Sequence, residues 1–157
     1  MKNDIEYLPI EKELNVILAE DDSADRLLFE EVLQELPVKT RFTTVSNGQE
    51  LLDWLSQNKD ILPDVLFLDL NMPRKNGFAA LGEIKRDHNL QNLPVFIFST
   101  ANDQERIKQV FKDAAHYYIR KPVKFRELKQ LIYKSLKLIA DDNISLPDKD
   151  NFILTSE

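Results

Sequence analysis

Residues that could do chemistry follow four short apolar runs of the sequence. The polar residues that end each run are Glu20, Asp21 and Asp22 after residues 16–19, Asp69 after 65–68, Ser99 and Thr100 after 95–98, and Lys121 after 117–119. Apolar runs of this length, bounded by polar residues, are typical of buried strands. Because ligands of parallel sheets bind beyond the carboxyl ends of the strands, these residues form one candidate site.

The types of these residues indicate phosphoryl chemistry assisted by a metal ion. Carboxylates that converge repel one another, and a hard divalent cation such as Mg²⁺ relieves the repulsion. The ammonium group of Lys121 and a hydroxyl group suit the oxygens of a phosphoryl group. With Asp69 as nucleophile, the set could form an acyl phosphate, with the cation bridging Asp69 and the phosphoryl oxygens.

Each feature also has an ordinary structural interpretation. Acids after a strand often cap the next helix, and we expect Asp22 and Ser23 to be caps in any case. A hydroxyl pair after a strand is usually a turn or a cap, and a Lys-Pro pair alone indicates almost nothing. The chemical hypothesis therefore rests on the occurrence of all the features together, in order, at four strand ends.

Helical patterns alternate with the apolar runs. We expect strands at 16–19, 41–45, 65–68, 95–98 and 117–119, the second of them half polar and therefore at an edge. The expected helices turn these apolar residues toward the core: Leu27, Leu28, Val32 and Leu33; Leu51, Leu52 and Leu55; Phe78, Leu81 and Ile84; Ile107, Val110, Phe111 and Ala114; Phe125, Leu128, Leu131, Ile132, Leu136 and Ile139. Asn47 and Asn76 can cap the second and third of these helices.

Five strands, each followed by a helix, predict an α/β fold. Three of the strands are apolar throughout, which is typical of strands covered on both faces in a parallel sheet. Right-handed crossovers then favour an open, doubly wound arrangement. The pattern stops after Ala140, and residues 141–157 are polar except for a patch at 152–154. This tail is either disordered or docked on the surface, and the sequence leaves both open.

The charge distribution disfavours several classes of function. Of the net charge of −6, residues 1–14 (two Lys, four acids) carry −2 and residues 141–157 (one Lys, five acids) carry −4, so 15–140 is neutral. The chain thus lacks a basic face for nucleic acid. No run approaches the ~20 apolar residues of a membrane span, and the first residues are not a signal peptide. With no cysteine, we expect a cytoplasmic protein that binds neither nucleic acid nor membrane.

Four motifs together resemble the receiver domain of bacterial two-component response regulators, the CheY-like superfamily. They are LAEDDS (18–23), LDLNMPRKNG (68–77), FST (98–100) and YIRKP (118–122). The resemblance covers about residues 14–140, between an N-terminal extension (1–13) and an acidic tail (141–157). The chain looks like the stand-alone receivers that partner phytochrome-type and other sensor histidine kinases. This implies a flavodoxin-like, five-stranded parallel sheet of order 2-1-3-4-5 with five helices.

The resemblance also implies the roles of the acidic residues. Asp69 would be the phosphoacceptor, and Glu20 and Asp21 would form the acidic pair that holds Mg²⁺, with Asp21 the more direct ligand. Asp69 itself and the backbone carbonyl of Asn71 would complete the protein's share of the coordination.

A second group of residues would respond to the phosphoryl group. Thr100 would donate a hydrogen bond to it and Lys121 would pair with it, next to a cis bond to Pro122. Tyr118 would be the switch aromatic: as Thr100 moves inward, an exposed ring would rotate into the space behind it. The face made by the fourth helix, fifth strand and fifth helix would change, and a homodimer through that face is a further expectation.

Two other functions fit parts of the pattern. A haloacid-dehalogenase-type phosphatase would also use Asp69 as nucleophile, but it needs a second acid two residues later, where this chain has Asn71. A pseudo-receiver would have lost the phosphoacceptor or the lysine, and Asp69 and Lys121 are both present. We therefore expect a protein that is not an enzyme. It would take its phosphoryl group from a sensor histidine kinase or a phosphotransfer protein and signal by binding, because the tail has no room for an output domain.

Overall fold

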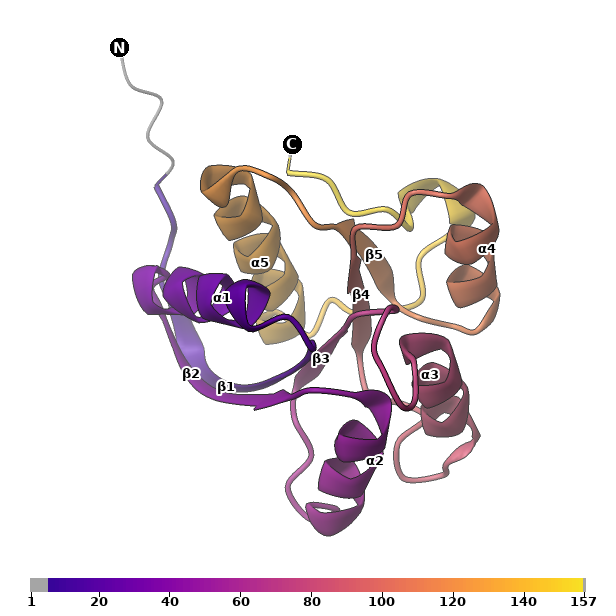
Figure 1. Ribbon diagram of the computed structural model, residues 1–157. Helices are drawn as coiled ribbons and strands as arrows, with labels where there is room; N and C mark the ends of the chain where they lie inside the picture. The colour runs from indigo at the N-terminus through magenta and orange to yellow at the C-terminus, as the bar shows by residue number, and fades with distance from the viewer. Residues whose placement is uncertain (1–5, 157) are drawn as a thin grey trace.

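Five parallel strands form the central sheet. In the computed structural model, which describes residues 6–156, they are β1 (Ile10–Ala19), β2 (Val38–Val45), β3 (Val65–Leu68), β4 (Val95–Ser99) and β5 (Tyr117–Arg120). They lie in the order β2-β1-β3-β4-β5, so the predicted order of a flavodoxin-like sheet is confirmed (Figure 1). The carboxyl ends of all five strands meet at one edge of this sheet.

Five helices cover the two faces of the sheet. They are α1 (Ser23–Glu35), α2 (Gly48–Gln57), α3 (Gly77–Arg86), α4 (Gln104–Lys112) and α5 (Phe125–Ala140), followed by a short 3-10 turn, η1 (Lys149–Asn151). Helices α1 and α5 share one apolar cluster with the sheet, and α2, α3 and α4 share the other (Figure 1). The predicted doubly wound arrangement is therefore confirmed.

The inner strands are buried on both faces. In β3, all four side chains are fully buried, and successive residues alternate between the two clusters: Leu66 packs toward α2 and α3, and Phe67 toward α1. The same alternation runs through β4. This explains why these strands are apolar throughout instead of alternating with polar residues.

Polar caps fix where the first helices start. The side chains of Asp22, Asn47 and Asn76 accept hydrogen bonds from the third residue beyond each of them, as expected of caps. Asp22, rather than Ser23, is the cap of α1. A side chain at Gly77 would collide with the backbone of Asp69 and Leu70, so glycine lets the loop after β3 fold back against the strand end.

The structure differs from the predicted elements in three places. Leu27 and Leu28 are exposed, and the buried side of α1 begins at Phe29, because three consecutive residues of a helix cannot all face the core. β1 starts at Ile10 rather than at residue 16, and β2 starts at Val38 rather than at residue 41, because Ile10 and Val38 pair with each other. Helix α4 ends at Lys112, and Ala114, expected on its apolar face, has a positive φ of 65° beyond the end of the helix.

The C-terminal tail docks on the domain. Ile153 forms a parallel bridge with Tyr118 of β5, and Phe152 and Leu154 are buried. Of the two alternatives that the sequence leaves open for the tail, disorder and docking, the structure shows docking. The division of the chain at residues 13 and 140 stays a prediction. Within residues 6–156, no helix has both the length and the apolar character needed to cross a membrane.

Candidate functional site

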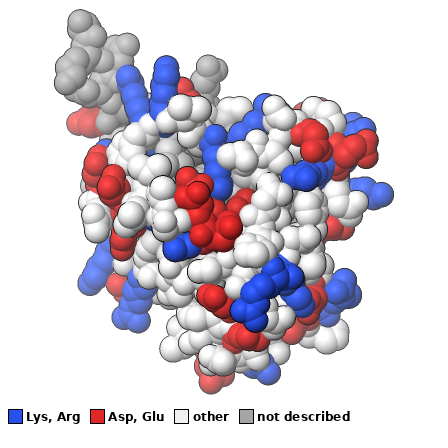
Figure 2. Space-filling view, in the orientation of Figure 1, with Lys and Arg blue, Asp and Glu red and all other residues white. Residues whose placement is uncertain are grey.

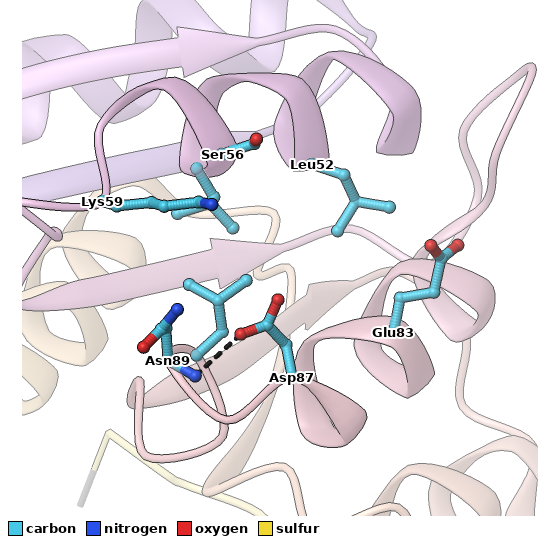
Figure 3. A pocket seen from close by; sticks show the side chains of 8 residues that line it. Leu52, Ser56, Lys59, Glu83, Asp87 and Asn89 are labelled. Carbon is cyan, nitrogen blue, oxygen red and sulfur yellow. Dashed lines mark hydrogen bonds between the residues drawn. The ribbon is translucent and has the colours of Figure 1, made fainter.

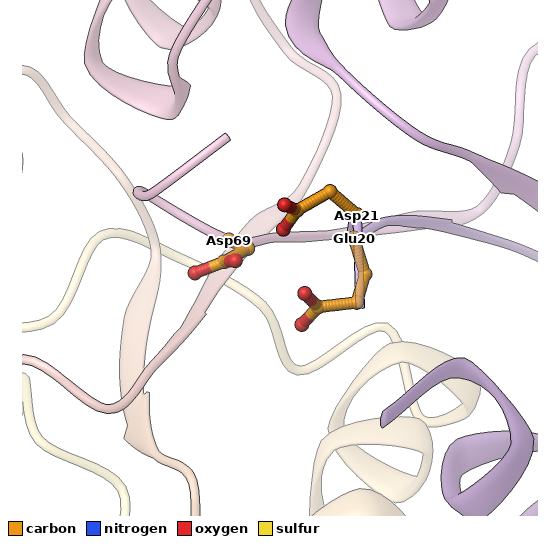
Figure 4. Close-up of side chains that lie close together, drawn as sticks. All are labelled: Glu20, Asp21 and Asp69. Atoms are coloured by element: carbon orange, nitrogen blue, oxygen red, sulfur yellow. The ribbon is translucent and has the colours of Figure 1, made fainter. Parts of the chain in front are cut away.

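The predicted site residues do meet at the carboxyl edge of the sheet. Ala19 and Leu68 are partners in the β1–β3 ladder, which brings the next residues of the two strands, Glu20 and Asp69, side by side. Asp21 follows on the same loop, and the three side chains converge in Figure 4. In Figure 2, acidic atoms gather near these strand ends with basic atoms beside them.

The three carboxylates form a group that could hold a metal ion. One oxygen of each of Glu20, Asp21 and Asp69 lies within 4.8 Å of the others. Glu20 is 1% and Asp69 4% exposed, whereas Asp21 is open to solvent. The cluster is therefore buried at its base and reachable from outside through Asp21, as an exchangeable metal ion requires.

Lys121 points its ammonium group into this cluster from the end of β5. Its Nζ lies 2.5 Å from Oε1 of Glu20, 3.0 Å from Oδ2 of Asp25 and 3.7 Å from Oδ2 of Asp69. The contact with Glu20 is an ion pair whose direction does not make a hydrogen bond to Oε1. Lys121 thus engages Glu20 and Asp25 closely and reaches Asp69 only at the limit of an ion pair.

The electrostatics of the pocket show an excess of negative charge. Burial, and then the neighbouring Asp69, raise the pKa of Glu20 to about 7 against the opposing effect of Lys121. Burial also raises the pKa of Asp69. Burial alone would lower the pKa of Lys121, but its close contacts with the carboxylates of Glu20 and Asp25 raise it. One ammonium group does not neutralise these carboxylates, and a divalent cation would relieve the remaining repulsion.

Asn71 lies within the loop that follows Asp69. Its backbone N–H donates to Oδ1 of Asp69 at 3.3 Å, which helps to orient the carboxylate. Its side-chain oxygen accepts a hydrogen bond from Arg106 of α4 at 3.1 Å. The loop after β3 is thereby tied to the start of α4, and the coordination of a metal ion by the Asn71 carbonyl stays a prediction.

Thr100 follows β4 and Tyr118 belongs to the adjacent strand β5, but Tyr118 is not exposed. Thr100 is exposed just beyond β4, while Tyr118 is fully buried and its hydroxyl donates to the carbonyl of Ala101 at 2.5 Å. The expectation of an exposed ring before phosphorylation is therefore wrong for this structure. Phe152 of the tail covers the ring, with 6.2 Å between the centroids, which explains the difference.

The sequence did not reveal two residues of the site, and the expected geometry of one peptide bond is wrong. Asp25, in the first turn of α1, binds Lys121, and Arg106 binds Asn71. The position of Asp25, four residues after Asp21 at the start of a helix, was the only available signal. Within the part of the chain that the structure describes there is no cis peptide bond, so the expected cis bond before Pro122 is wrong.

A cavity elsewhere in the molecule is unrelated to this cluster. It has a volume of about 200 Å³ and lies between α2 and the end of α3, with Leu52, Lys59 and Glu83 in its wall (Figure 3). Asp87 there accepts a hydrogen bond from the backbone of Asn89 at 2.7 Å. The carboxyl ends of these helices lie at the sheet edge opposite Asp69, because each helix runs antiparallel to the strands.

Comparison with known proteins gives consistent results. A family model described as "Response regulator receiver domain" matches residues 16–133. The chain is 32% identical over 131 residues to the two-component response regulator ARR17 of Arabidopsis thaliana, covering 78% of this chain and 84% of that protein. It is 26% identical over 136 residues to the response regulator Rcp1 of Synechocystis, covering 84% and 92%.

Solved structures show the same fold. The crystal structure of the phosphorylated cyanobacterial phytochrome response regulator RcpA is 31% identical, with a TM-score of 0.72, and covers 87% of this chain and all of that one (100%). Some relatives are longer: the chain spans 61% of the length of ARR15 of Arabidopsis thaliana.

Proposed function

Because the chain belongs to the response regulator receiver family, we propose that Asp69 accepts a phosphoryl group and that the phosphorylated chain signals by binding another protein. One observation carries the proposal. Asp69 is a buried carboxylate at the end of the central strand β3, beside two further carboxylates and the ammonium group of Lys121. The similarity of the chain to RcpA, a response regulator solved in its phosphorylated form, supports this assignment.

The donor would be a phosphorylated histidine of a sensor histidine kinase or a phosphotransfer protein. An oxygen of Asp69 attacks the phosphorus atom, an O–P bond forms, and the bond from phosphorus to the donor nitrogen breaks. The electron pair of that bond stays on the nitrogen. The product is an acyl phosphate on Asp69. Burial raises the pKa of Asp69, and a nearby cation would favour the ionised carboxylate, which is the nucleophile.

Mg²⁺ is the cation that the donor set fits. Glu20, Asp21 and Asp69 offer only oxygen ligands, and Mg²⁺ binds through one or two carboxylates while it keeps several waters. The carbonyl of Asn71 is our proposed fourth protein ligand. When bound, the ion would neutralise charge on the phosphoryl oxygens. The geometry supports this assignment, because three carboxylates converge on a site where Lys121 supplies one positive charge.

Lys121 and Thr100 would bind the phosphoryl group once it has formed. Lys121 lies 3.7 Å from Asp69 and would exchange part of its contact with Glu20 and Asp25 for the new oxygens. Thr100 is exposed at the next strand end and offers a hydroxyl donor. Its hydrogen bond to a charged acceptor would contribute roughly 1.5–3 kcal/mol. Tyr118, bonded to Ala101, would sense the resulting movement of Thr100.

The signal would leave through the face of α4, β5 and α5. Tyr118 of β5 links this face to Thr100, and a second copy of the chain is one partner we propose for it. The mixed charges of α4 suit reciprocal pairing in such a dimer. The balanced charge of residues 15–140 argues against nucleic acid as a partner. We propose the cytoplasm as the compartment, in keeping with a chain that carries no cysteine.

Intact-mass spectrometry tests the assignment of Asp69. The chain, incubated with phosphoramidate and Mg²⁺, should gain the mass of one phosphoryl group, and the gain should be stable in acid and labile in alkali. Asp69→Ala should not gain this mass. A full gain in the Asp69→Ala variant would refute the assignment.

A further inference from the structure

The C-terminal segment adds a short strand to the open edge of the sheet. The N–H of Tyr118 donates to the carbonyl of Phe152 at 3.0 Å, and the N–H of Leu154 donates to the carbonyl of Tyr118 at 2.9 Å. Ile153 is thus the parallel partner of Tyr118. In Figure 1 the segment, in yellow, leaves the end of α5 and ends near β5. Strand addition of this kind is a common way in which proteins bind extended peptides.

The side chains of this segment fill both sides of the sheet edge. Phe152 is 2% exposed and packs against Phe111 of α4, with an edge-to-face geometry and 5.2 Å between the ring centroids. Leu154 is buried on the opposite face, in the cluster that contains α5. Lys134 of α5 donates to the carbonyl of Thr155 at 2.9 Å. An aromatic and an aliphatic residue, two positions apart, therefore anchor the segment.

Among residues 6–156, the stretch before the segment contributes little to holding it in place. Residues 145–151, which connect it to the body of the domain, bury no side chain, and η1 within this stretch has no buried residue. The segment is thus a small apolar ligand on a polar tether, a kind of region from which local unfolding of a domain often starts. We call the surface under the segment the seat: it is the edge of β5 at Tyr118, between Phe111 of α4 and the apolar cluster of α5. Without the segment, the seat would be an unpaired strand edge, which is a template for another extended chain.

We propose that the edge of β5, with α4 and α5 on its two sides, is a docking site for an extended segment with an aromatic anchor, and that residues 152–154 fill it in the same chain. An outside partner that uses this site presents an aromatic residue and, two positions later, an aliphatic residue. It competes with Phe152 and Leu154 for the same pockets. The proposal rests on the proposed function only in that the site shares Tyr118 with the signalling face.

A labelled peptide tests the site without any phosphorylation. The probe is a fluorescent peptide of residues 148–156, and its binding to the full-length chain is measured by fluorescence polarisation. The Phe152→Ala chain, whose own anchor is removed, should bind the peptide at least about ten-fold more tightly than the wild-type chain does. Leu146→Ala is the control, because Leu146 is an exposed residue of the same tail, and this variant should behave like the wild type.

Two further measurements make each outcome decisive. A peptide that itself carries Phe152→Ala should not bind, and amide exchange in the wild type should show protection of Tyr118 and Leu154, the two donors of the added strand. Equal peptide binding by wild type and Phe152→Ala, binding by neither, or unprotected amides would overturn the proposal. So would a dimer that depends on Phe152, because a second copy would then fill the seat. None of these results bears on whether Asp69 is phosphorylated.

Discussion

The pocket at Asp69 and the seat of the C-terminal segment both involve β5, because Lys121 follows this strand and Tyr118 belongs to it. The two regions are built in opposite ways. The pocket gathers carboxylates around one ammonium group in a partly buried site, so its parts repel one another until a cation binds. The seat gathers aromatic and aliphatic side chains that already pack against one another. The comparison shows that one region is prepared to take up a ligand, whereas the other already contains one.

Removal of the metal ion should produce the largest effect, and only in the pocket. Excess chelator, or Asp21→Asn, should lower the rate of phosphorylation by phosphoramidate at least about 100-fold, because charge on the carboxylates and phosphoryl oxygens is then unbalanced. Asp22→Asn is the matched control: it removes the neighbouring charge, and Asn caps a helix as well as Asp does.

The same treatment sharpens the comparison between the two regions. Amide exchange of Leu154 should not change in the presence of chelator, because the seat contains no carboxylate of the cluster. Phosphorylation at an unchanged rate in chelator would contradict the account of the pocket.

Truncation of aromatic residues should distinguish the docked C-terminal segment from the closed core. Phe67→Ala removes a fully buried ring from β3 and should lower the free energy of unfolding by about 3–5 kcal/mol. Phe152→Ala should cost only about 1–2 kcal/mol, because local detachment of the segment would limit the loss to the free energy of docking. Chemical denaturation measures both values, and equal costs would show that the tail is an integral part of the core.

The amino end of β5 should respond to pH through His116. The backbone N–H of Val95 donates to Nδ1 of His116 at 3.1 Å, and burial, followed by Lys85, lowers the pKa of His116 to about 4. Between this value and the ordinary 6.5, the unfolded chain binds more protons than the folded one. Stability should therefore be complete above pH 6.5 and fall as the pH drops toward 4, by about 3 kcal/mol.

The variant His116→Gln isolates this effect. Glu20 acts in the opposite direction, because its raised pKa adds stability as the pH falls below about 7. The difference between the unfolding free energies of wild type and His116→Gln removes the contribution of Glu20. That difference should shrink as the pH falls from 6.5 to 4, and a constant difference would show that His116 does not titrate in this range.

Asp25 at the rim of the pocket should have the smallest effect. It holds Lys121 at 3.0 Å and competes with a phosphoryl group for the ammonium group. Asp25→Asn should therefore raise the affinity for beryllofluoride, a phosphoryl mimic, by about two- to five-fold, as expected for one partly exposed ion pair. Titration of the wild type, Asp25→Asn and the control Glu31→Gln measures this change. In the Lys121→Gln background, Asp25→Asn should have no effect; a rise there would mean that Asp25 acts by charge alone.

The fold was largely predictable because local patterns and tertiary structure agree. Apolar runs at β3 and β4 mark strands buried on both faces, and caps such as Asn47 and Asn76 mark helix starts. The failures have physical causes. Leu27 and Leu28 resemble core residues until the helical period is fixed by Phe29. The first half of β1 has charged side chains that look like a loop and is a strand only because β2 lies beside it.

The acidic pocket and the seat also differ in how far the sequence predicts them. Charged residues directly after buried strands stand out in a sequence, so Glu20, Asp69 and Lys121 could be placed together in advance, although their individual roles stay predictions. Asp25 could not, because a carboxylate in the first turn of a helix has an ordinary explanation as a favourable interaction with the helix dipole. The docking of Phe152 depends on its packing against Phe111 and Tyr118, which come together only after folding.

The most direct test of the central claim is to locate the phosphoryl group chemically. Borohydride reduces an aspartyl phosphate to homoserine, and peptide mass spectrometry then identifies the reduced residue. After phosphorylation in the presence of Mg²⁺, we expect homoserine at position 69 alone, and none when the ion has been removed. A reduced side chain at Glu20 or Asp21, or a phosphorylated chain without reduction at position 69, would contradict the account.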